Sequence, residues 1–401
     1  MSVHPTIYLK KGREDSLKRF HPWVFSGAVE RMEGSPVAGD VVSVRSSSGE
    51  FLACGHYQKD SICVRILSFD SPELPKNFWY ERLQAAYDAR KASRLVGNRD
   101  TTCYRLVCGE GDDLPGLIID IYGGTAVVQC HSVGMFRSRS EITDALRQVY
   151  GIGLDAVYDK SSGTAPFGRN NESSDGYLWR SANYDPSSYK ECLEYGHRFF
   201  VDWEKGQKTG FFLDQRENRR LVEKYASGRN VLNLFCYTGG FSVYALAGGA
   251  KHVDSVDSSR SAISMLERNI ELNGFGKGSS EAFCADAADF LNCSPDGRYD
   301  MLVLDPPAFA KHRAALPNAL KAYRHLNASA ISKAASGSFI FTFSCSQVVD
   351  HDAFALSVFS AAASVGRRVK IVDRLNQPAD HPVNIYHPEG EYLKGLALYV
   401  E

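Results

Sequence analysis

Long apolar runs are missing from this chain of 401 residues: none approaches the ~20 residues that a helix needs to cross a bilayer. The N-terminal segment, Met1-Ser2-Val3-His4-Pro5, also lacks the apolar core of a secretory signal. These two absences predict a cytoplasmic protein with no membrane partner.

Metal-binding cysteine patterns are missing as well. The ten cysteines include no C-x-x-C pair and no zinc-ligand spacing, so we expect no metal site. Most of them stand in apolar stretches, and nine are expected to be buried, reduced thiols. The tenth, Cys345, follows an apolar strand and stands between two serines.

Two nucleotide-binding motifs and a general basic surplus are also missing. Neither G-x-G-x-x-G nor G-x-x-x-x-G-K-[ST] occurs, which argues against a dinucleotide site and against an ATP phosphate site. The net charge of −1 argues against a nucleic-acid binder that is basic overall. Residues 10–31 nevertheless hold six Lys and Arg against three Asp and Glu, and this local surplus of +3 is either a solvated face or a binding patch.

The chain is too long for one ordinary domain, because domains average ~150 residues. Short strands and a Ser-rich hairpin turn at 46–49 predict an all-β first domain over residues 1–70. Mixed helical and strand patterns follow over residues 75–190, including a helix at 135–150 and a polar loop at 169–176.

From residue 191 to residue 401 the pattern alternates between short apolar strands and amphipathic helices. This alternation predicts an α/β domain with a parallel sheet covered on both faces. The predicted strands are 231–235, 252–256, 281–284, 301–304, 338–343 and 370–372, and the clearest helices are 259–273, 317–335 and 351–364. A last strand at 391–400 has too little room for a helix before it and should run antiparallel.

The ends of three successive strands in this domain carry residues that suit an adenosine group. Gly239 and Gly240 allow a sharp turn and a close approach of the backbone to a ligand. Asp257 ends the next strand, where an acid can accept hydrogen bonds from ribose hydroxyls. Asp286 ends the third strand, where a carboxylate could reach an adenine amine. Ordinary turn glycines and helix-capping acids are the structural alternatives.

S-adenosylmethionine fits these strand ends, because it carries adenosine and no phosphate. Its amino-acid tail needs polar partners rather than a phosphate-binding loop. The expected cofactor contacts in this region are Phe235, Tyr237, Thr238, Gly239, Gly240, Asp257 and Asp286.

The residues after the next two strands suit chemistry on a pyrimidine base. Asp305 begins a rigid Asp-Pro-Pro-Ala-Phe turn that could hold a base edge, and Phe309 offers a ring on which a flipped base could stack. Cys345 stands just past the strand 338–343, where a thiol would be reachable. A thiolate that adds to carbon 6 of a pyrimidine turns carbon 5 into a nucleophile. The alternatives are a rigid capped loop and an ordinary free cysteine.

Three motifs occur together in the last domain: Asn233-Leu-Phe-Cys-Tyr-Thr-Gly-Gly-Phe241, Asp305-Pro-Pro-Ala-Phe309 and Phe343-Ser-Cys-Ser346. Together they resemble the class I S-adenosylmethionine-dependent methyltransferases of ribosomal RNA. The chain is most similar to the bacterial large-subunit rRNA cytosine-C5 methyltransferase family with an N-terminal PUA domain. The segments 208–216, 380–395 and 21–27 also match, so the resemblance covers nearly the whole chain.

The resemblance implies three domains. They are a PUA-type RNA-binding barrel at 1–70, a small α+β domain at 75–190, and a Rossmann-like sheet of six parallel strands and one antiparallel strand at 191–401. It also implies that Gln215 and Arg216 contact the methionine end of the cofactor. Phe235 and Tyr237 depart from the glycines that many methyltransferases have at these positions. RNA contacts are expected from the basic run, at Lys11, Arg13, Lys18 and Arg19.

The resemblance further implies methyl transfer from S-adenosylmethionine to carbon 5 of a cytosine in large-subunit ribosomal RNA. Cys345 would be the nucleophile and Asp305 would recognise the base. Two alternatives stay open: methylation of an exocyclic amine of an RNA base, which needs no thiol, and binding of structured RNA without catalysis. An NAD-linked oxidoreductase is disfavoured by the missing glycine pattern.

The base that removes the proton from carbon 5 is not singled out. Asp380 and His381 are candidates, and a surface His-Pro turn is an equal alternative for them. The residues do not indicate an oligomeric state.

Overall fold

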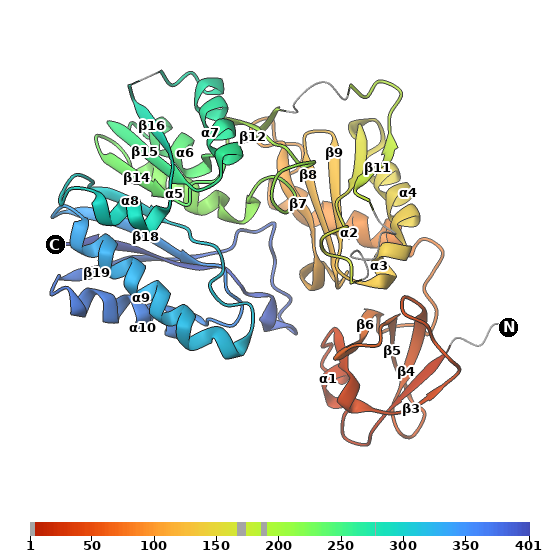
Figure 1. Cartoon of the computed structure of the whole chain (residues 1–401). Helices are drawn as coiled ribbons and strands as arrows, with labels where there is room; N and C mark the ends of the chain where they lie inside the picture. Colours follow the sequence, from red (N-terminus) through yellow and green to blue (C-terminus); the bar gives the residue numbers. More distant parts are fainter. Residues whose placement is uncertain (1–4, 167–173, 186–190, 277) are drawn as a thin grey trace. The chain divides into compact units, whose positions relative to one another are not determined.

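The computed structural model describes residues 5–166, 174–185, 191–276 and 278–401 (Figure 1). Most of the loop expected at 169–176 therefore lies outside the described residues. The chain forms two compact units. Unit 1 contains Met1–Leu193, Val201–Leu213 and Ala379–Gly390, and unit 2 contains Glu194–Phe200, Asp214–Pro378 and Glu391–Glu401.

A six-stranded sheet forms the first part of unit 1. Its order is β2-β6-β5-β4-β1-β3, and the short helix α1 (Asp15–Lys18) lies between the first two strands in the sequence. The strands are β1 (Thr6–Leu9), β2 (Trp23–Phe25), β3 (Val29–Glu33), β4 (Val41–Arg45), β5 (Phe51–Tyr57) and β6 (Ile62–Ser68). β4 and β5 pair antiparallel around the Ser-rich turn, which confirms the predicted hairpin.

A five-stranded sheet with the order β11-β10-β9-β8-β7 forms the second part of unit 1. Its elements are α2 (Phe78–Ala92), β7 (Cys103–Cys108), β8 (Leu117–Tyr122), β9 (Thr125–Cys130), α3 (Val133–Arg137), α4 (Arg139–Tyr150), β10 (Ala156–Asp159) and β11 (Gly176–Arg180). The single helix predicted at 135–150 is wrong. Ser138 ends α3 and begins α4, and the hydroxyl of Ser132 caps α3 by accepting from the backbone N–H of Met135 at 3.3 Å.

Unit 2 is built on a seven-stranded sheet with the order β16-β15-β14-β17-β18-β20-β19. Its strands are β14 (Asn230–Leu234), β15 (His252–Asp257), β16 (Ser280–Cys284), β17 (Met301–Leu304), β18 (Ser338–Ser344), β19 (Val369–Asn376) and β20 (Lys394–Val400). β20 runs antiparallel to both of its neighbours, and the other strands share one direction. The predicted sheet of six parallel strands and one antiparallel strand is therefore confirmed.

Helices cover both faces of this sheet, as the continuous apolar strands predict. Figure 1 shows α5, α6 and α7 on one side, and α8, α9 and α10 on the other. They are α5 (Arg216–Tyr225), α6 (Gly240–Ala247), α7 (Arg260–Leu272), α8 (Ala287–Cys293), α9 (Leu316–Lys333) and α10 (His351–Ser364). One core cluster joins the strands to α9 and α10, where Tyr323 and Phe354 are buried.

The two compact units group some segments differently from the predicted domains. Val201–Leu213 and Ala379–Gly390 belong to unit 1, although the predicted boundary at residue 191 assigns them to the last domain. Within unit 1, the buried Arg90 holds the segment Ala379–Gly390 in place, because its Nη2 donates to the carbonyl of Asp380 at 3.1 Å. The division at 70, 75, 190 and 191 stays a prediction. Within the described ranges, no helix has the length and apolar character of a membrane span.

A buried ion pair in unit 2 gives the first testable prediction. The carboxylate of Glu194 is fully buried and accepts from Arg219 Nε and Nη2, both at 2.7 Å, and from the hydroxyl of Tyr244 at 3.0 Å. Glu194→Gln would leave the Arg219 charge buried without its partner, so we expect a loss of about 3–5 kcal/mol in the free energy of unfolding. Urea denaturation measures it.

Glu217→Gln is the matched control, because Glu217 pairs with Arg220 at 3.2 Å on the surface. Its expected loss is below about 1 kcal/mol. Equal losses in the two variants would contradict the argument.

Candidate active site

The carboxyl ends of five parallel strands lie along one edge of the unit 2 sheet. Open α/β sheets bind their ligands at this edge. The residues that the sequence singled out follow β14, β15, β16, β17 and β18, so the topology brings these strand ends to one edge.

The loop between β14 and α6 has an unusual backbone. Phe235, Tyr237 and Gly239 all have positive φ values, of 58°, 46° and 86°. Residues other than glycine adopt this conformation at a cost of roughly 1–2 kcal/mol, and such strain gathers at functional sites. Phe235 and Tyr237 are the two positions where the sequence departs from the usual glycines. The loop therefore keeps a glycine-like backbone without glycine at those positions.

Gly239 is required for a second reason. A Cβ atom built on it would lie 2.7 Å from Cγ of Leu266, closer than real Cβ atoms approach a neighbour. The hydroxyl of Thr238 is buried in the same loop and has no hydrogen-bond partner among the described residues. A tight turn with an unused buried hydroxyl fits a loop that holds a polar ligand.

Asp257, at the end of β15, supports this loop. Its Oδ2 accepts from the backbone N–H of Tyr237 at 2.9 Å, and its Oδ1 accepts from the N–H of Ser259 at 2.8 Å. The cap of α7 is instead the hydroxyl of Ser259, which accepts from the N–H of Ala262 at 3.3 Å. Each carboxylate oxygen can accept a further hydrogen bond, so Asp257 can hold the loop and a ribose together.

Asp286 caps a helix, which is the structural alternative to a cofactor contact that its sequence position left open. Its Oδ1 accepts from the backbone N–H groups of Ala288 and Asp289, at 2.9 and 3.0 Å, at the start of α8. The residue is exposed. Its role toward an adenine amine stays a prediction that would rest on Oδ2.

Gln215 contacts a predicted catalytic group. Its side-chain Nε2 donates to Oδ1 of Asp305 at 3.1 Å, and its Oε1 accepts from Asn218 Nδ2 at 2.6 Å. Gln215 and the neighbouring Arg216 are both buried, and Arg216 Nη2 lies 3.9 Å from Oε2 of Glu194. The segment predicted to hold the methionine end of the cofactor therefore also orients the Asp305 carboxylate.

Asp305 and Cys345 follow adjacent parallel strands. β17 pairs with β18 in register, with Leu304 opposite Thr342, so both side chains start from the same edge of the sheet. The two loops are also linked, because the backbone N–H of Ala310 donates to Ser346 Oγ at 3.4 Å. Cys345 is half-buried, whereas the serines on either side of it are buried.

Several other thiols in the chain have surroundings that keep them protonated. Burial raises the pKa of Cys54 and Cys63 to about 11, and the pKa of Cys108 and Cys130 to about 12. Of the nine cysteines expected to be buried, Cys293 is exposed, and Cys108 and Cys284 are half-buried, so the expectation is wrong for these three.

Phe309 has a structural contact that the sequence did not predict. Its ring packs on the buried Tyr323 of α9, with ring centroids 4.7 Å apart. The hydroxyl of Tyr323 lies 3.2 Å from Ser346 Oγ. Tyr323 therefore contacts both the loop after β17, through Phe309, and the loop after β18, through Ser346. Phe309 remains half-buried, and its stacking on a base stays a prediction.

Sequence reasoning missed Lys394, at the start of β20. Its side chain is 2% exposed, and its ammonium donates to the backbone carbonyls of Ser346 and Val349, which follow Cys345. Burial lowers the pKa of Lys394 to about 8. A lysine inside the apolar run Leu-Lys-Gly-Leu-Ala-Leu was the available signal, because lysine is rarely buried without a partner.

Asp380 and His381 do not form a surface turn. Both are buried in unit 1, where Asp380 Oδ2 accepts from the backbone N–H of Arg105 at 3.0 Å and Asp380 Oδ1 lies 3.0 Å from Nδ1 of His381. The surface-turn alternative is therefore wrong, and a catalytic role for either residue stays untested.

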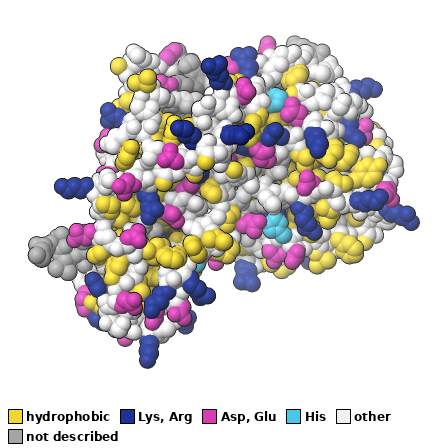
Figure 2. Space-filling view, turned by 180° about the vertical axis from the view of Figure 1, so that it is seen from behind, with side chains coloured by type: hydrophobic (Ala, Val, Ile, Leu, Met, Phe, Trp, Pro, Cys, Tyr) yellow, Lys and Arg dark blue, Asp and Glu magenta, His cyan; other side chains and the backbone are white. Residues whose placement is uncertain are grey.

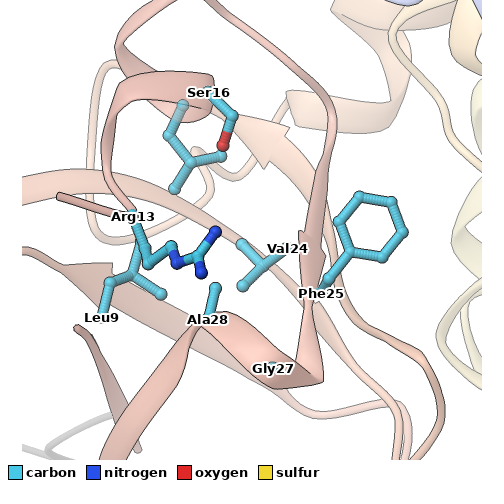
Figure 3. Close-up of a pocket in the computed structure, with 8 residues that line it drawn as sticks. Leu9, Arg13, Ser16, Val24, Phe25, Gly27 and Ala28 are labelled. Atoms are coloured by element: carbon cyan, nitrogen blue, oxygen red, sulfur yellow. The ribbon is translucent and has the colours of Figure 1, made fainter.

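The predicted RNA contacts lie in the six-stranded sheet region of unit 1. Lys11, Arg13, Lys18 and Arg19 are all exposed, and Lys18 is within 3.5 Å of Glu50. Arg13 also lines a pocket of about 270 Å³. Figure 3 shows its guanidinium group beside the side chain of Val24, whereas the ring of Phe25 points away from it. Figure 2 shows, on the face it presents, Lys and Arg side chains interspersed with Asp and Glu.

The expectation of no metal site stays a prediction. Two groups of side chains place their possible ligand atoms within 4.8 Å of one another. They are His21, His387 and Glu389, and His252, Asp254 and Glu281.

Comparison with known proteins decides the family. The S-adenosylmethionine-dependent methyltransferase family model matches residues 169–388, and a PUA-like domain model matches residues 7–69. The chain belongs to the S-adenosylmethionine-dependent methyltransferases. Its cofactor is S-adenosylmethionine, and the strained loop, Gly239 and the buried Thr238 hydroxyl fit such a group.

Relatives of this methyltransferase cover its whole length. The Aeromonas hydrophila protein named ribosomal RNA large subunit methyltransferase I is 39% identical over 397 residues, which is 98% of each chain. The protein of the same name from Klebsiella pneumoniae strain 342 is 37% identical over 403 residues, covering 100% of this chain and 99% of the relative. The fold is shared with the crystal structure of SMU.776 complexed with SAH, at a TM-score of 0.84 and 24% identity, covering 98% and 99% of the two chains.

The turn at Gly239 gives the second prediction. Gly239→Ala adds a side chain to a left-handed backbone and against Leu266, so we expect the affinity for S-adenosylmethionine to fall at least about tenfold in calorimetry.

Gly276→Ala is the matched control, because a Cβ atom at Gly276 meets nothing within 4 Å and the residue has no positive φ. Unchanged affinity in Gly239→Ala would show that this loop does not hold the cofactor.

Proposed function

We propose that this methyltransferase transfers a methyl group to carbon 5 of a cytosine in large-subunit ribosomal RNA, through a covalent bond between Cys345 and the base. One observation carries the proposal: Asp305 and the half-buried Cys345 follow adjacent parallel strands at the ligand-binding edge, on loops that are hydrogen-bonded to each other. Relatives that are 37–39% identical over the full chain are named for ribosomal RNA of the large subunit, which supports the substrate class.

Cys345 would act as the nucleophile. Its thiolate adds to carbon 6 of the cytosine, and the electron pair of the carbon 5–carbon 6 double bond becomes available at carbon 5. S-adenosylmethionine, when bound, supplies an electrophilic methyl group on a positively charged sulfur. After carbon 5 has gained the methyl group, its proton leaves to a base, the double bond forms again, and the carbon 6–sulfur bond breaks to release the thiolate.

Asp305 would hold the base. A carboxylate with a fixed position can bind the amino edge of cytosine and support a proton at the ring nitrogen while the thiolate adds. Gln215 holds Oδ1 at 3.1 Å, and Pro306 and Pro307 restrict the backbone that follows. A carboxylate accepts several hydrogen bonds at once, so this restraint is compatible with binding of the base. It also limits the side-chain freedom that binding would otherwise remove.

The PUA-like domain would bind the RNA around the target. Arg13 and Phe25 both line the pocket, Arg13 is exposed and Phe25 is 50% exposed, so this surface offers a cation and an aromatic ring. This combination binds phosphates and unstacked bases in single-stranded RNA.

Methylation of an exocyclic amine is the second candidate function. The Asp-Pro-Pro turn with a half-buried Phe309 favours it, because such a site holds an amine with its carboxylate and needs no thiol. Cys345 separates the two candidates.

The third prediction concerns the nucleophile. Cys345→Ala should lower methylation of ribosomal RNA by at least about 1,000-fold and leave S-adenosylmethionine affinity unchanged, because the covalent step is lost and the cofactor loop is not. Radiolabelled methyl transfer and calorimetry measure the two effects.

Cys293→Ala, at an exposed cysteine of α8, is the matched control and should keep full activity. RNA that contains 5-fluorocytosine should form a stable adduct with the unchanged protein and none with Cys345→Ala. Full activity in Cys345→Ala would move the assignment to an exocyclic amine.

The fourth prediction concerns RNA binding. Reversing two charges in Arg13→Glu/Arg19→Glu should lower RNA affinity by about tenfold or more at low salt. The salt dependence of binding should also weaken, by about 0.7 in the log–log slope for each phosphate that the protein no longer neutralises.

Lys91→Glu/Arg99→Glu, at two exposed residues of the second part of unit 1, is the control because it changes the net charge by the same amount. An equal loss of affinity in this control would argue against a specific contact surface on the PUA-like domain.

A further inference from the structure

A buried lysine lies beside the proposed nucleophile. Lys394 of β20 stands opposite Ser344 of the antiparallel strand β18. Ser344 is the residue immediately before Cys345. Its side chain is 2% exposed. Burying an ammonium group is costly unless hydrogen bonds and an opposite charge offset the loss of water, so this position needs a physical reason.

The hydrogen bonds of Lys394 hold the turn after Cys345. Nζ donates to the carbonyl of Ser346 at 2.7 Å and also to the carbonyl of Val349. An ammonium has three protons, so one remains after these two bonds. Lys394 therefore fixes the backbone on the carboxyl side of Cys345, while β18 fixes the backbone on the other side.

Among the negative charges around Lys394, the thiolate of Cys345 has the strongest effect on its pKa. Burial is the largest influence on its pKa and lowers it, and a negative charge on Cys345 is the strongest of the influences that raise it. The other two are Glu391 and Asp350, which are exposed to solvent. Glu391 is paired with His351 at 3.0 Å, and Asp350 caps α10 by accepting from the N–H of Ala353 at 2.7 Å.

One further titratable group faces this turn from α9. The hydroxyl of Tyr323 lies 3.2 Å from Ser346 Oγ, and burial raises its pKa, so it stays neutral. Lys394 is thus a buried positive charge that is hydrogen-bonded to the turn after Cys345, and the thiolate of Cys345 is the negative charge that influences it most.

We propose that Lys394 is a positioning residue for Cys345: its ammonium group holds the 346–349 turn and stabilises the thiolate. The proposal rests on Cys345 being the nucleophile and deepens that assignment. The effect is reciprocal. The attraction that stabilises the charged ammonium of Lys394 next to a thiolate stabilises the thiolate of Cys345 by the same free energy. The stabilised thiolate is needed both when sulfur attacks and when it leaves.

The thiolate can be measured without RNA. In the unchanged protein, the rate of iodoacetamide alkylation at Cys345, followed by mass spectrometry of its peptide, should rise with pH around a midpoint at least about one pH unit below that of Cys293. Cys293 is exposed and serves as an internal reference thiol. A Cys345 midpoint equal to or above the Cys293 midpoint would overturn the proposal without any variant.

Variants separate charge from packing. Lys394→Met should raise the Cys345 midpoint by about one unit or more and leave the Cys293 midpoint unchanged, whereas Lys394→Arg, which keeps the charge, should restore most of the shift. The matched control is Lys160→Met in unit 1, because Lys160 also holds a turn through backbone carbonyls, those of Trp203, Glu204 and Gly206. This control should not change the Cys345 midpoint.

The outcomes can be told apart. If the Lys394→Met protein still binds S-adenosylmethionine and its Cys345 midpoint is unchanged, Lys394 is only a structural support and the proposal is overturned. If Lys394→Met does not fold, the unchanged protein and Lys394→Arg still decide, because both midpoints are expected below that of Cys293. If Cys345→Ala keeps full activity, the proposed function fails, and the alkylation midpoints still test the contact between Lys394 and Cys345.

Discussion

Parallel pairing of β14, β17 and β18 is the constraint on which the rest of this site depends. Parallel strands in register end at one edge of a sheet, so groups that follow them start within reach of one another. The glycine loop after β14, Asp305 after β17 and Cys345 after β18 share this origin. Residues more than a hundred positions apart in the chain are thereby brought to one edge, with the apolar strands buried beneath them between two layers of helices.

Buried and partly buried polar contacts then hold the loops at this edge in place. Asp257 binds the backbone of the glycine loop, Gln215 binds Asp305, and Ser346 receives a hydrogen bond from the backbone that follows Phe309. Such contacts are stronger in a buried setting than in water, and a missing partner is costly there. The positive φ values at Phe235 and Tyr237 persist because this surrounding network over-determines them. A preorganised site of this kind has little left to order when substrates bind.

Local patterns predicted most of the elements of unit 2. The strand Met301–Leu304 and the helix His351–Ser364 have the predicted bounds, and the other strands differ by a few residues at their ends. Apolar runs of four to seven residues between amphipathic helices carry that information because strand and helix periodicities are local properties. The break at Ser138 was missed, because a serine inside a helical pattern does not show from spacing alone that it will end one helix and begin another. The surface turn left open for Asp380 and His381 was also wrong, because the contacts of the buried Asp380 come from Arg90 and Arg105, far away in the chain.

The sequence by itself determined the family, the order of strands and helices, and the residues that stand at each strand end. These follow from periodicity and short motifs, which are written over a few neighbouring positions. Only the tertiary structure decided that β20 enters the sheet beside β18 and not at its outer edge, which brings Lys394 opposite Ser344 and under the turn of Cys345. The choice of neighbour for a strand depends on how the whole sheet buries its apolar faces, and no local pattern contains it.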